Sequence, residues 1–374
     1  MTFGFLSVIL VVMDLYQKIS ILGPSAQYDT CGPKDFGKTT DIPGVYHAKV
    51  GGSHICRLFK VLQSNACTNN CNYCAFRRDR DCNRVIATPD EMARAFDSAY
   101  SRRLVDGLFL SSGVINNAST TMTKMLDTAH ILRAKYKYTG YLHLKLMPGS
   151  PENTVEEAMK VANRISVNIE APTASSLAQL SPEKNLKEDL LKTLALVLKY
   201  RRKAKAIGSR RVPSLTTQFV IGAGNETDGE LVEATNVLYE KFGLTRVFYS
   251  AFRPVPKTPL AEKPAESLVR EHRLYQVDFL MRFYKFSPRE IPLDKRGFLS
   301  ETEDPKMLWA KNNPEFFPIN MNTAGYYQLL RVPGIGPTSA RKILDLRKES
   351  RINSFDRFAG LRVQVKKMSE FVTV

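Results

Sequence analysis

Alternation of short apolar segments with longer amphipathic segments is the sequence feature that most restricts how this chain folds. From about residue 55 to residue 250, each apolar run of strand length is followed by a segment with helical spacing. This order predicts repeated strand-helix-strand units, which build a parallel sheet with helices packed against it. The expected strands are Cys56–Ser64, Gly107–Ser111, Tyr141–Lys145, Ser166–Ile169, Thr216–Val220 and Arg246–Ser250, and the expected helices lie near 89–103, 120–135, 153–162, 186–206 and 228–242.

Six such units predict an α/β fold, a partial (βα)6 barrel of the TIM type. Period-2 alternation along residues 141–147 turns one set of side chains toward the helices and the other toward the lumen. The outward set is Leu142, Leu144 and Leu146, and the inward set is Tyr141, His143, Lys145 and Met147. The same count places Asn168 and Glu170 inside the barrel. Such a lumen predicts either a polar ligand or an internal salt bridge between Lys145 and Glu170.

The chain of 374 residues is long enough for such a barrel and a small second domain. Four prolines between residues 254 and 264 end the alternation, and a basic, aromatic helix follows within 266–286. We expect an N-terminal extension (1–50), the barrel (51–252), a linker with a helical extension (253–322) and a small all-α domain (323–374).

An apolar run at residues 3–13 requires its own interpretation. It is too short to span a bilayer, and it lacks the basic start and the cleavage site of a signal peptide. We interpret it as a packing segment, or as an extension upstream of a true start at Met13. The expected location is therefore cytoplasmic, with no membrane partner.

Positive charge is concentrated in two segments of this chain, whose formal net charge is +17. Residues 199–211 contain seven Lys or Arg and no acid, and residues 331–367 contain ten basic residues against three acidic ones. Clusters of this kind attract a polyanion, whereas an evenly basic surface would only aid solubility. Nucleic acid is the expected partner.

Four of the six cysteines lie between residues 67 and 82, which favours a metal site over disulfides in an intracellular protein. Cys67, Cys71 and Cys74 form a Cx3CxxC pattern directly after the first expected barrel strand. Three thiolates on a short loop can ligate three irons of a cubane cluster and leave the fourth iron open. The alternatives are a structural zinc with Cys56 or Cys82 as fourth ligand, and simple buried thiols.

With the aromatic Tyr73 before its third cysteine, this loop resembles that of the radical S-adenosylmethionine (SAM) superfamily. The resemblance implies a [4Fe-4S] cluster on the three cysteines, SAM bound to the open iron, and reductive cleavage of SAM to a 5′-deoxyadenosyl radical. It also implies an electron donor such as a flavodoxin or ferredoxin. The segment from Ser111 to Gly113 lacks the Glu of the superfamily's Gly-Gly-Glu-like turn, so only backbone contacts to SAM are expected there. The expected cofactor-binding residues are Tyr73, Ser111, Ser112, Gly113, Lys145, Asn168, Glu170, Gln218 and Gly222.

Residues 329–343 resemble a helix-hairpin-helix. Two glycines permit a tight turn whose N–H groups, near a helix N-terminus, can hold a phosphate. The alternative is a plain turn between two helices that cap the barrel. The expected nucleic-acid-binding residues are Pro333, Gly334, Ile335, Gly336, Thr338, Arg341 and Lys342.

Together with the segments SSGVI, GYLHLKLMPG and SVNIEAPT, this hairpin resembles a family of radical SAM proteins assigned to DNA modification or repair. That resemblance implies DNA rather than RNA as the nucleic acid, and a uracil-DNA-glycosylase-like partner. The alternatives are a radical SAM enzyme acting on tRNA or a small molecule, and a non-catalytic DNA-binding protein with a structural metal site.

Overall fold

A computed structural model describes residues 14–28, 43–49, 55–209, 211–358 and 364–374. The apolar run at 3–13 and Cys31 lie outside these residues. Among the helices that the structure describes, none has both the length and the apolarity needed to cross a membrane.

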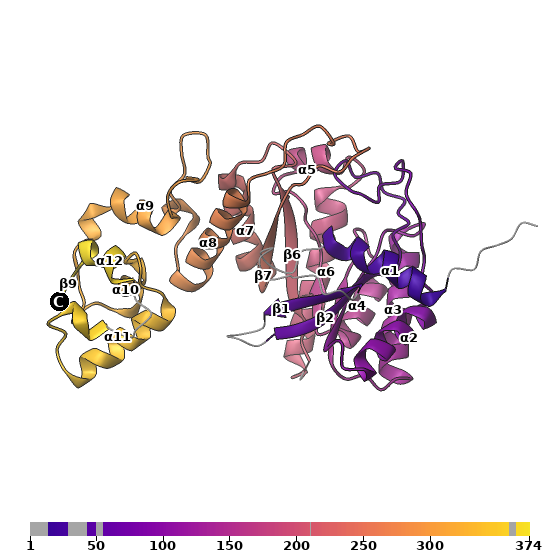
Figure 1. Ribbon diagram of the computed structural model, residues 1–374, viewed down its shortest axis with the longest axis horizontal. Coiled ribbons are helices and arrows are strands. Elements are labelled where there is room, and N and C mark those ends of the chain that lie inside the picture. The colour runs from indigo at the N-terminus through magenta and orange to yellow at the C-terminus, as the bar shows by residue number, and fades with distance from the viewer. Residues whose placement is uncertain (1–13, 29–42, 50–54, 210, 359–363) are drawn as a thin grey trace, which may run out of the picture.

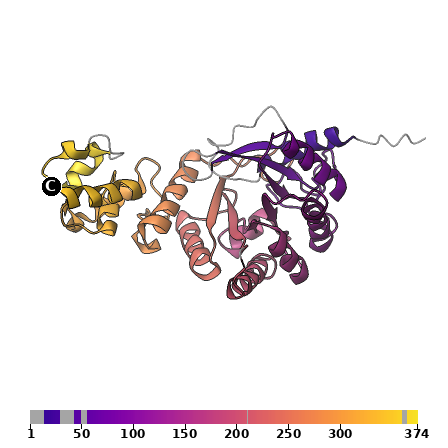
Figure 2. The same ribbon diagram turned by 90° about the horizontal axis from the view of Figure 1, so that it is seen from below.

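Seven strands form one sheet in the order of the chain. Strands β2 to β7 are parallel to one another, and β1 pairs antiparallel with β2 at the edge. Figure 2 shows the sheet as an open arc with helices on its outer side. The predicted α/β half-barrel is therefore confirmed, with β1 as an additional edge strand. The strands are β1 Val45–Lys49, β2 Ile55–Leu62, β3 Gly107–Ser111, β4 Tyr141–Lys145, β5 Arg164–Ser166, β6 Ser214–Ile221 and β7 Arg246–Ala251.

Local sequence signals set the ends of the barrel helices. Thr88 and Thr227 each cap a helix in a capping box with the Glu three residues later, and Pro89 occupies the first helical position. Gly243 ends its helix at φ +59°, a conformation that favours glycine. The barrel region contains α1 Leu15–Ser25, α2 Pro89–Ser101, α3 Ala118–Ala134, α4 Glu152–Val161, α5 Ala174–Leu180, a π-helical segment Leu186–Leu191 that continues into α6 Lys192–Ala206, and α7 Asp228–Phe242.

The core lies between the sheet and the outer helices. Leu108, Leu110, Leu142 and Leu144 are fully buried, as expected of strand residues that face the helices. The expected strand at Ser166–Ile169 is wrong in its position, because β5 covers residues 164–166 and ends before Val167. The following residues leave regular strand geometry, and Glu170 adopts a left-handed φ of +67°.

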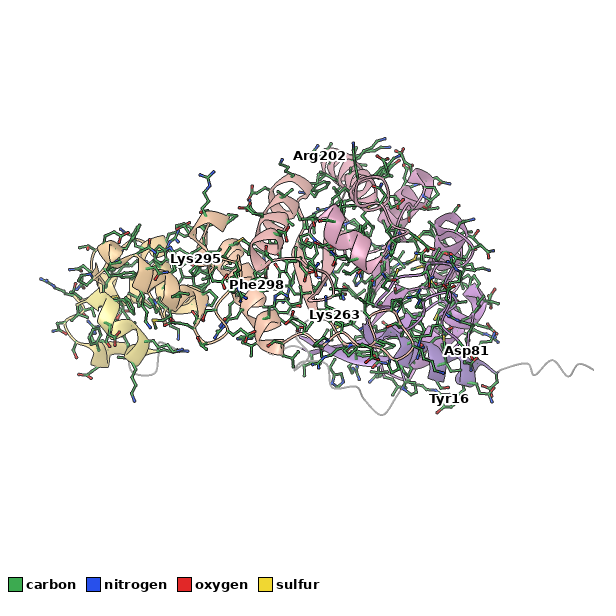
Figure 3. The ribbon with its side chains drawn as sticks, turned by 90° about the horizontal axis from the view of Figure 1, so that it is seen from above. Tyr16, Asp81, Arg202, Lys263, Lys295 and Phe298 are labelled. Atoms are coloured by element: carbon green, nitrogen blue, oxygen red, sulfur yellow. The ribbon has the colours of Figure 1, made fainter. Side chains whose placement is uncertain are left out.

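The remaining helices continue from the β7 edge of the sheet. Helix α8 (Leu268–Tyr284) lies between the barrel and a smaller group of helices at the C-terminal end (Figure 1). Lys295 and Phe298 lie in the segment between these two parts, as Figure 3 shows. The smaller group contains α9 Pro305–Asn312, β8 Ile319–Asn320, α10 Tyr326–Arg331, α11 Pro337–Glu349, α12 Val365–Met368 and β9 Val372–Thr373.

Buried ionic contacts fix α8 against the barrel. Arg270 on α8 donates to the Asp228 carboxylate at 2.8 Å, and Asp228 also accepts the backbone N–H of Leu299 at 2.8 Å. Both charged side chains are nine-tenths or more buried. Separating such a pair would leave uncompensated buried charges. The pair therefore holds α8 in place on the barrel.

Candidate cofactor site

One cavity collects the ends of five barrel strands. The cysteine loop follows β2, and the next contributions come from the ends of β3 and β4, the segment after β5, and β6. The carboxyl ends of parallel strands are where α/β barrels build their sites. Of the predicted site residues, the cavity is lined by Cys67, Cys71, Cys74, Tyr73, Ser111, Ser112, Gly113, Lys145, Asn168, Glu170 and Gln218.

Backbone hydrogen bonds hold the cysteine loop against the rest of the barrel. Thr68 N–H donates to the Val114 carbonyl at 2.9 Å, and Asn72 N–H donates to the Leu180 carbonyl at 2.7 Å. The loop is thereby tied both to the segment after β3 and to the end of α5. This arrangement fixes the three cysteines before any ligand arrives.

Arg84 organises the same loop from inside, and sequence reasoning missed it. Its guanidinium donates to four backbone carbonyls at 2.6 to 2.9 Å. The carbonyls of an irregular loop have no partners in a helix or sheet. A planar guanidinium with five N–H donors can supply those hydrogen bonds. The carbonyls belong to Asn65, Phe76, Arg77 and Arg80.

The sulfur atoms carry the features of metal ligands. All three cysteines are free of disulfides, and Cys71 is buried. Val114 N–H donates to Cys67 Sγ at 3.3 Å, and Phe76 N–H donates to Cys74 Sγ at 3.4 Å. Hydrogen bonds to the sulfurs are among the contacts that tune iron–sulfur clusters. Burial, and then the neighbouring Cys71, raise the pKa of the Cys74 thiol to about 12.

A buried ion pair lies beside the cysteines. Lys184 Nζ is 3.2 Å from Glu170 Oε1, and both side chains are less than a tenth exposed. Although burial opposes it, the charges of Cys71 and Glu170 raise the pKa of Lys184. Burial, followed by the charge of Glu170, also raises the pKa of Tyr73. Lys184 is therefore a cation held next to the thiols, and sequence reasoning missed it.

Three expectations about the lumen need correction. Glu170 forms its ion pair with Lys184, so the alternative of a salt bridge between Lys145 and Glu170 is wrong. Leu146 was expected to face the helices but lines the cavity, because β4 ends at Lys145 and the alternation stops there. Gly222 is absent from the residues that line the cavity, and its N–H bonds to the Glu226 carboxylate instead.

His143 lies deeper in the barrel than the cavity lining. Its ring stacks on Phe109 with centroids 4.0 Å apart, and its Nε2 lies 2.9 Å from Ser166 Oγ. Burial, and then Arg164, lower the pKa of His143 well below its usual value. The inward orientation expected for His143 is thus observed, and its ring is a neutral packing group beneath the site.

The donor set fits an iron–sulfur cluster better than a single zinc ion. Among the described residues, no group of three or more His, Cys, Asp or Glu side chains is spaced to hold one metal ion. Thiolates that bind three different irons of a cubane must lie farther apart than ligands of one ion. Cys56 and Cys82, the expected alternatives for a fourth zinc ligand, are not among the residues that line the cavity.

Close packing at Gly113 yields a first testable prediction. A Cβ on this residue would lie 2.5 Å from the Ala66 carbonyl oxygen and 3.1 Å from Cys67 Cβ, so the cysteine loop would have to move. We expect Gly113→Ala to fold but to retain less iron than the wild type after anaerobic reconstitution, measured as iron per chain. Ser112→Ala is the matched control, and equal iron content in all three proteins would contradict the expectation.

The fold and site of this protein are an α/β half-barrel with three free cysteines at its mouth, and comparison with known proteins finds a superfamily that matches this barrel. Residues 61–238 match the model of the Radical SAM superfamily, so the chain carries a domain of that superfamily. Members are enzymes that cleave SAM reductively, and they bind a [4Fe-4S] cluster and SAM.

Individual relatives are distant. A tRNA-2-methylthio-N(6)-dimethylallyladenosine synthase of Alkaliphilus oremlandii (strain OhILAs) is 25% identical over 179 residues, or 46% of this chain and 36% of the synthase. The chain thus spans about a third of the length of this curated relative. Among solved structures, methylornithine synthase (PylB) has a TM-score of 0.48 at 15% identity, covering 72% of this chain and 66% of that one. The maturase HydG from Carboxydothermus hydrogenoformans has a TM-score of 0.46 at 16% identity, covering 59% and 50%.

Proposed function

We propose that this chain is a radical SAM enzyme that modifies or repairs nucleic acid, with DNA as the favoured substrate. One observation supports the enzymatic part of this proposal. The three cysteines and eight of the nine residues expected to contact SAM line the same cavity. The nucleic-acid part is supported by the basic C-terminal hairpin.

Cys67, Cys71 and Cys74 would hold the cluster, and the residues around them would hold SAM. Bound together, these groups would supply the chemistry of reductive SAM cleavage. Lys184 and Glu170 keep a fixed cation and anion at the cavity wall. Glu170 Oε2 is buried without a hydrogen-bond partner, so it is available to accept a hydroxyl or ammonium group of SAM. Apolar Leu62, Met147 and Val220 would help exclude water.

Reduction of the cluster requires a partner, and we propose a flavodoxin or ferredoxin in that role. The test of the enzymatic proposal is the release of 5′-deoxyadenosine from SAM by the anaerobically reconstituted, reduced protein. Whole-nucleoside mass spectrometry of DNA and RNA, from cells with and without the protein, then identifies the modified polymer. A DNA nucleoside that differs supports the proposal, and an unchanged pool of both polymers contradicts it.

The local geometry of the hairpin supports the proposal of phosphate binding. Helix α10 ends at Arg331 and α11 starts at Pro337, so the turn spans only five residues. Gly334 has φ +83°, and a Cβ there would lie 2.9 Å from the Gln364 carbonyl oxygen, so glycine is required. Buried Leu329, Ile335 and Ile343 pack the two helices together. Exposed Arg341 and Lys342 follow in the first turns of α11.

Charge reversal at the hairpin gives the second prediction. We expect Arg341→Glu with Lys342→Glu to weaken binding of every DNA sequence alike and to reduce the slope of log affinity against log salt. Removal of one phosphate-binding cation lowers that slope by about 0.9 for duplex DNA. Arg94→Glu with Arg102→Glu, on and directly after α2, is the matched control, because both side chains are exposed and lie outside the two basic segments. A slope unchanged by the hairpin substitutions would contradict phosphate binding there.

A tRNA substrate is the second candidate, and the observation that favours it is the similarity to the Alkaliphilus synthase, whose name specifies a modified tRNA adenosine. Competition between duplex DNA, single-stranded DNA and tRNA at physiological salt separates the two. Preferred binding of tRNA would replace the DNA proposal. A uracil-DNA-glycosylase-like partner is a further proposal, tested by co-purification from cells.

A further inference from the structure

A large groove separates α8 from the hairpin turn. Its volume is about 820 Å³, within the range of sites that bury most of a small ligand. One wall is α8, the opposite wall is the turn from Pro333 to Ser339, and one end is closed by the start of α9. This groove is distinct from the cofactor cavity, since the residues that line the two do not overlap.

The α8 wall presents a stripe of side chains suited to base stacking. His272, Gln276 and Phe279 lie at helical spacing along the groove, and Phe279 is 47% exposed. Phe283, one turn further, packs against Phe279 with ring centroids 5.3 Å apart and is 45% exposed. Exposing two adjacent phenylalanines costs free energy in water, so such a pair is typical of a surface that another molecule covers.

The opposite wall is fixed to α8 at its base. Lys306 Nζ donates to the Ile335 carbonyl at 2.6 Å and lies 4.6 Å from the centre of the Tyr284 ring. A Cβ on Gly336 would lie 3.3 Å from the Tyr284 hydroxyl, which shows how closely the turn approaches the helix there. The aromatic wall and the turn are therefore held at a constant separation.

The charges in and around the groove favour an anion. Lys367 lines it and belongs to residues 331–367, which carry ten basic against three acidic residues. Two acids also line it, but both are occupied by the protein. Asp304 accepts the backbone N–H of Lys306 and the side-chain amide of Gln276, and Glu303 pairs with Lys311.

The groove also begins near the barrel mouth. Glu266 N–H donates to the carbonyl of Phe252, the residue directly after β7, so the start of α8 lies at the carboxyl rim of the sheet. His272 follows one turn after the first residue of α8. A polymer in the groove would thus leave it next to the rim that carries the cofactor cavity.

We propose that this groove binds a single-stranded segment of the nucleic acid, with a base stacked on Phe279 and the backbone running along the hairpin turn. The inference rests on the proposed function and specifies the state of its substrate. Bases in a duplex already stack on one another and offer no free face, whereas single strands gain affinity from aromatic platforms and a basic groove.

The test measures affinities of the full chain for oligo(dT), oligo(U) and a duplex at fixed salt. We expect Phe279→Ala to weaken oligo(dT) binding by about 10- to 100-fold and to leave duplex binding unchanged. Leu268→Ala is the matched control, because Leu268 is equally exposed on the same helix but outside the groove. Phe279→Trp should retain affinity, and its emission should be quenched by oligo(dT). The native Trp309 is only 4% exposed and contributes a constant background.

The outcomes separate this inference from the function on which it rests. If Phe279→Ala binds oligo(dT) as tightly as the wild type, or weakens duplex binding equally, the groove proposal is wrong. If no oligonucleotide binds the wild type, the nucleic-acid function itself is wrong. If oligo(U) binds more tightly than oligo(dT), the groove still binds a single strand, but DNA is not its preferred ligand.

Discussion

Cys71→Ala is expected to abolish both iron retention and SAM cleavage while leaving the fold intact. Cys71 is the buried member of the three cavity cysteines, and its replacement leaves two thiolates for a cluster that needs three from the protein. The side chain becomes slightly smaller, so the stability of the cluster-free protein should change little. Iron content and 5′-deoxyadenosine release after anaerobic reconstitution measure the effect.

Two other cysteines provide controls for this substitution. Cys56 and Cys82 are also free and partly buried, but neither lines the cavity. Cys56→Ala and Cys82→Ala should therefore retain the iron content and turnover of the wild type. Loss of iron in Cys82→Ala together with retention in Cys71→Ala would assign the metal to a different set of ligands.

Glu170→Ala is expected to lower the free energy of unfolding of the metal-free protein by about 3 kcal/mol. The substitution leaves Lys184 buried without its counter-charge, and breaking a buried pair by removing one partner typically costs about 3 to 5 kcal/mol. Denaturant unfolding under anaerobic conditions measures the change. The same variant should also bind SAM more weakly, because it lacks the unpaired Oε2 in the cavity wall.

A double variant separates the structural role of this pair from its role toward SAM. Glu170→Gln combined with Lys184→Met removes both charges, so most of the original stability should return. SAM affinity, measured by equilibrium dialysis with the cluster-loaded protein, should stay reduced. Full recovery of SAM affinity in the double variant would show that Glu170 acts only by stabilising the fold.

Sequence reasoning succeeded where the signals are local. The strands Gly107–Ser111 and Tyr141–Lys145 have their predicted bounds, because each is a short apolar run between clear helical segments. The cysteines and the polar residues at strand ends meet in one cavity because parallel strands bring their carboxyl ends to the same edge.

The rest depended on contacts between distant parts of the chain. Lys184 lies in a loop after α5 whose position follows from the bond between Asn72 and Leu180, and no local pattern indicates it. Arg84 likewise acts by donating to backbone carbonyls of the cysteine loop, and the residues next to Arg84 in the sequence do not indicate these contacts.

Electron paramagnetic resonance of the reduced, reconstituted protein, recorded before and after addition of SAM, reports whether one iron is left open for SAM. We expect about four irons per chain and a spectrum that changes when SAM is added. A protein that holds zinc in place of iron, or a cluster spectrum that SAM leaves unchanged, would contradict a three-cysteine cluster with an open iron.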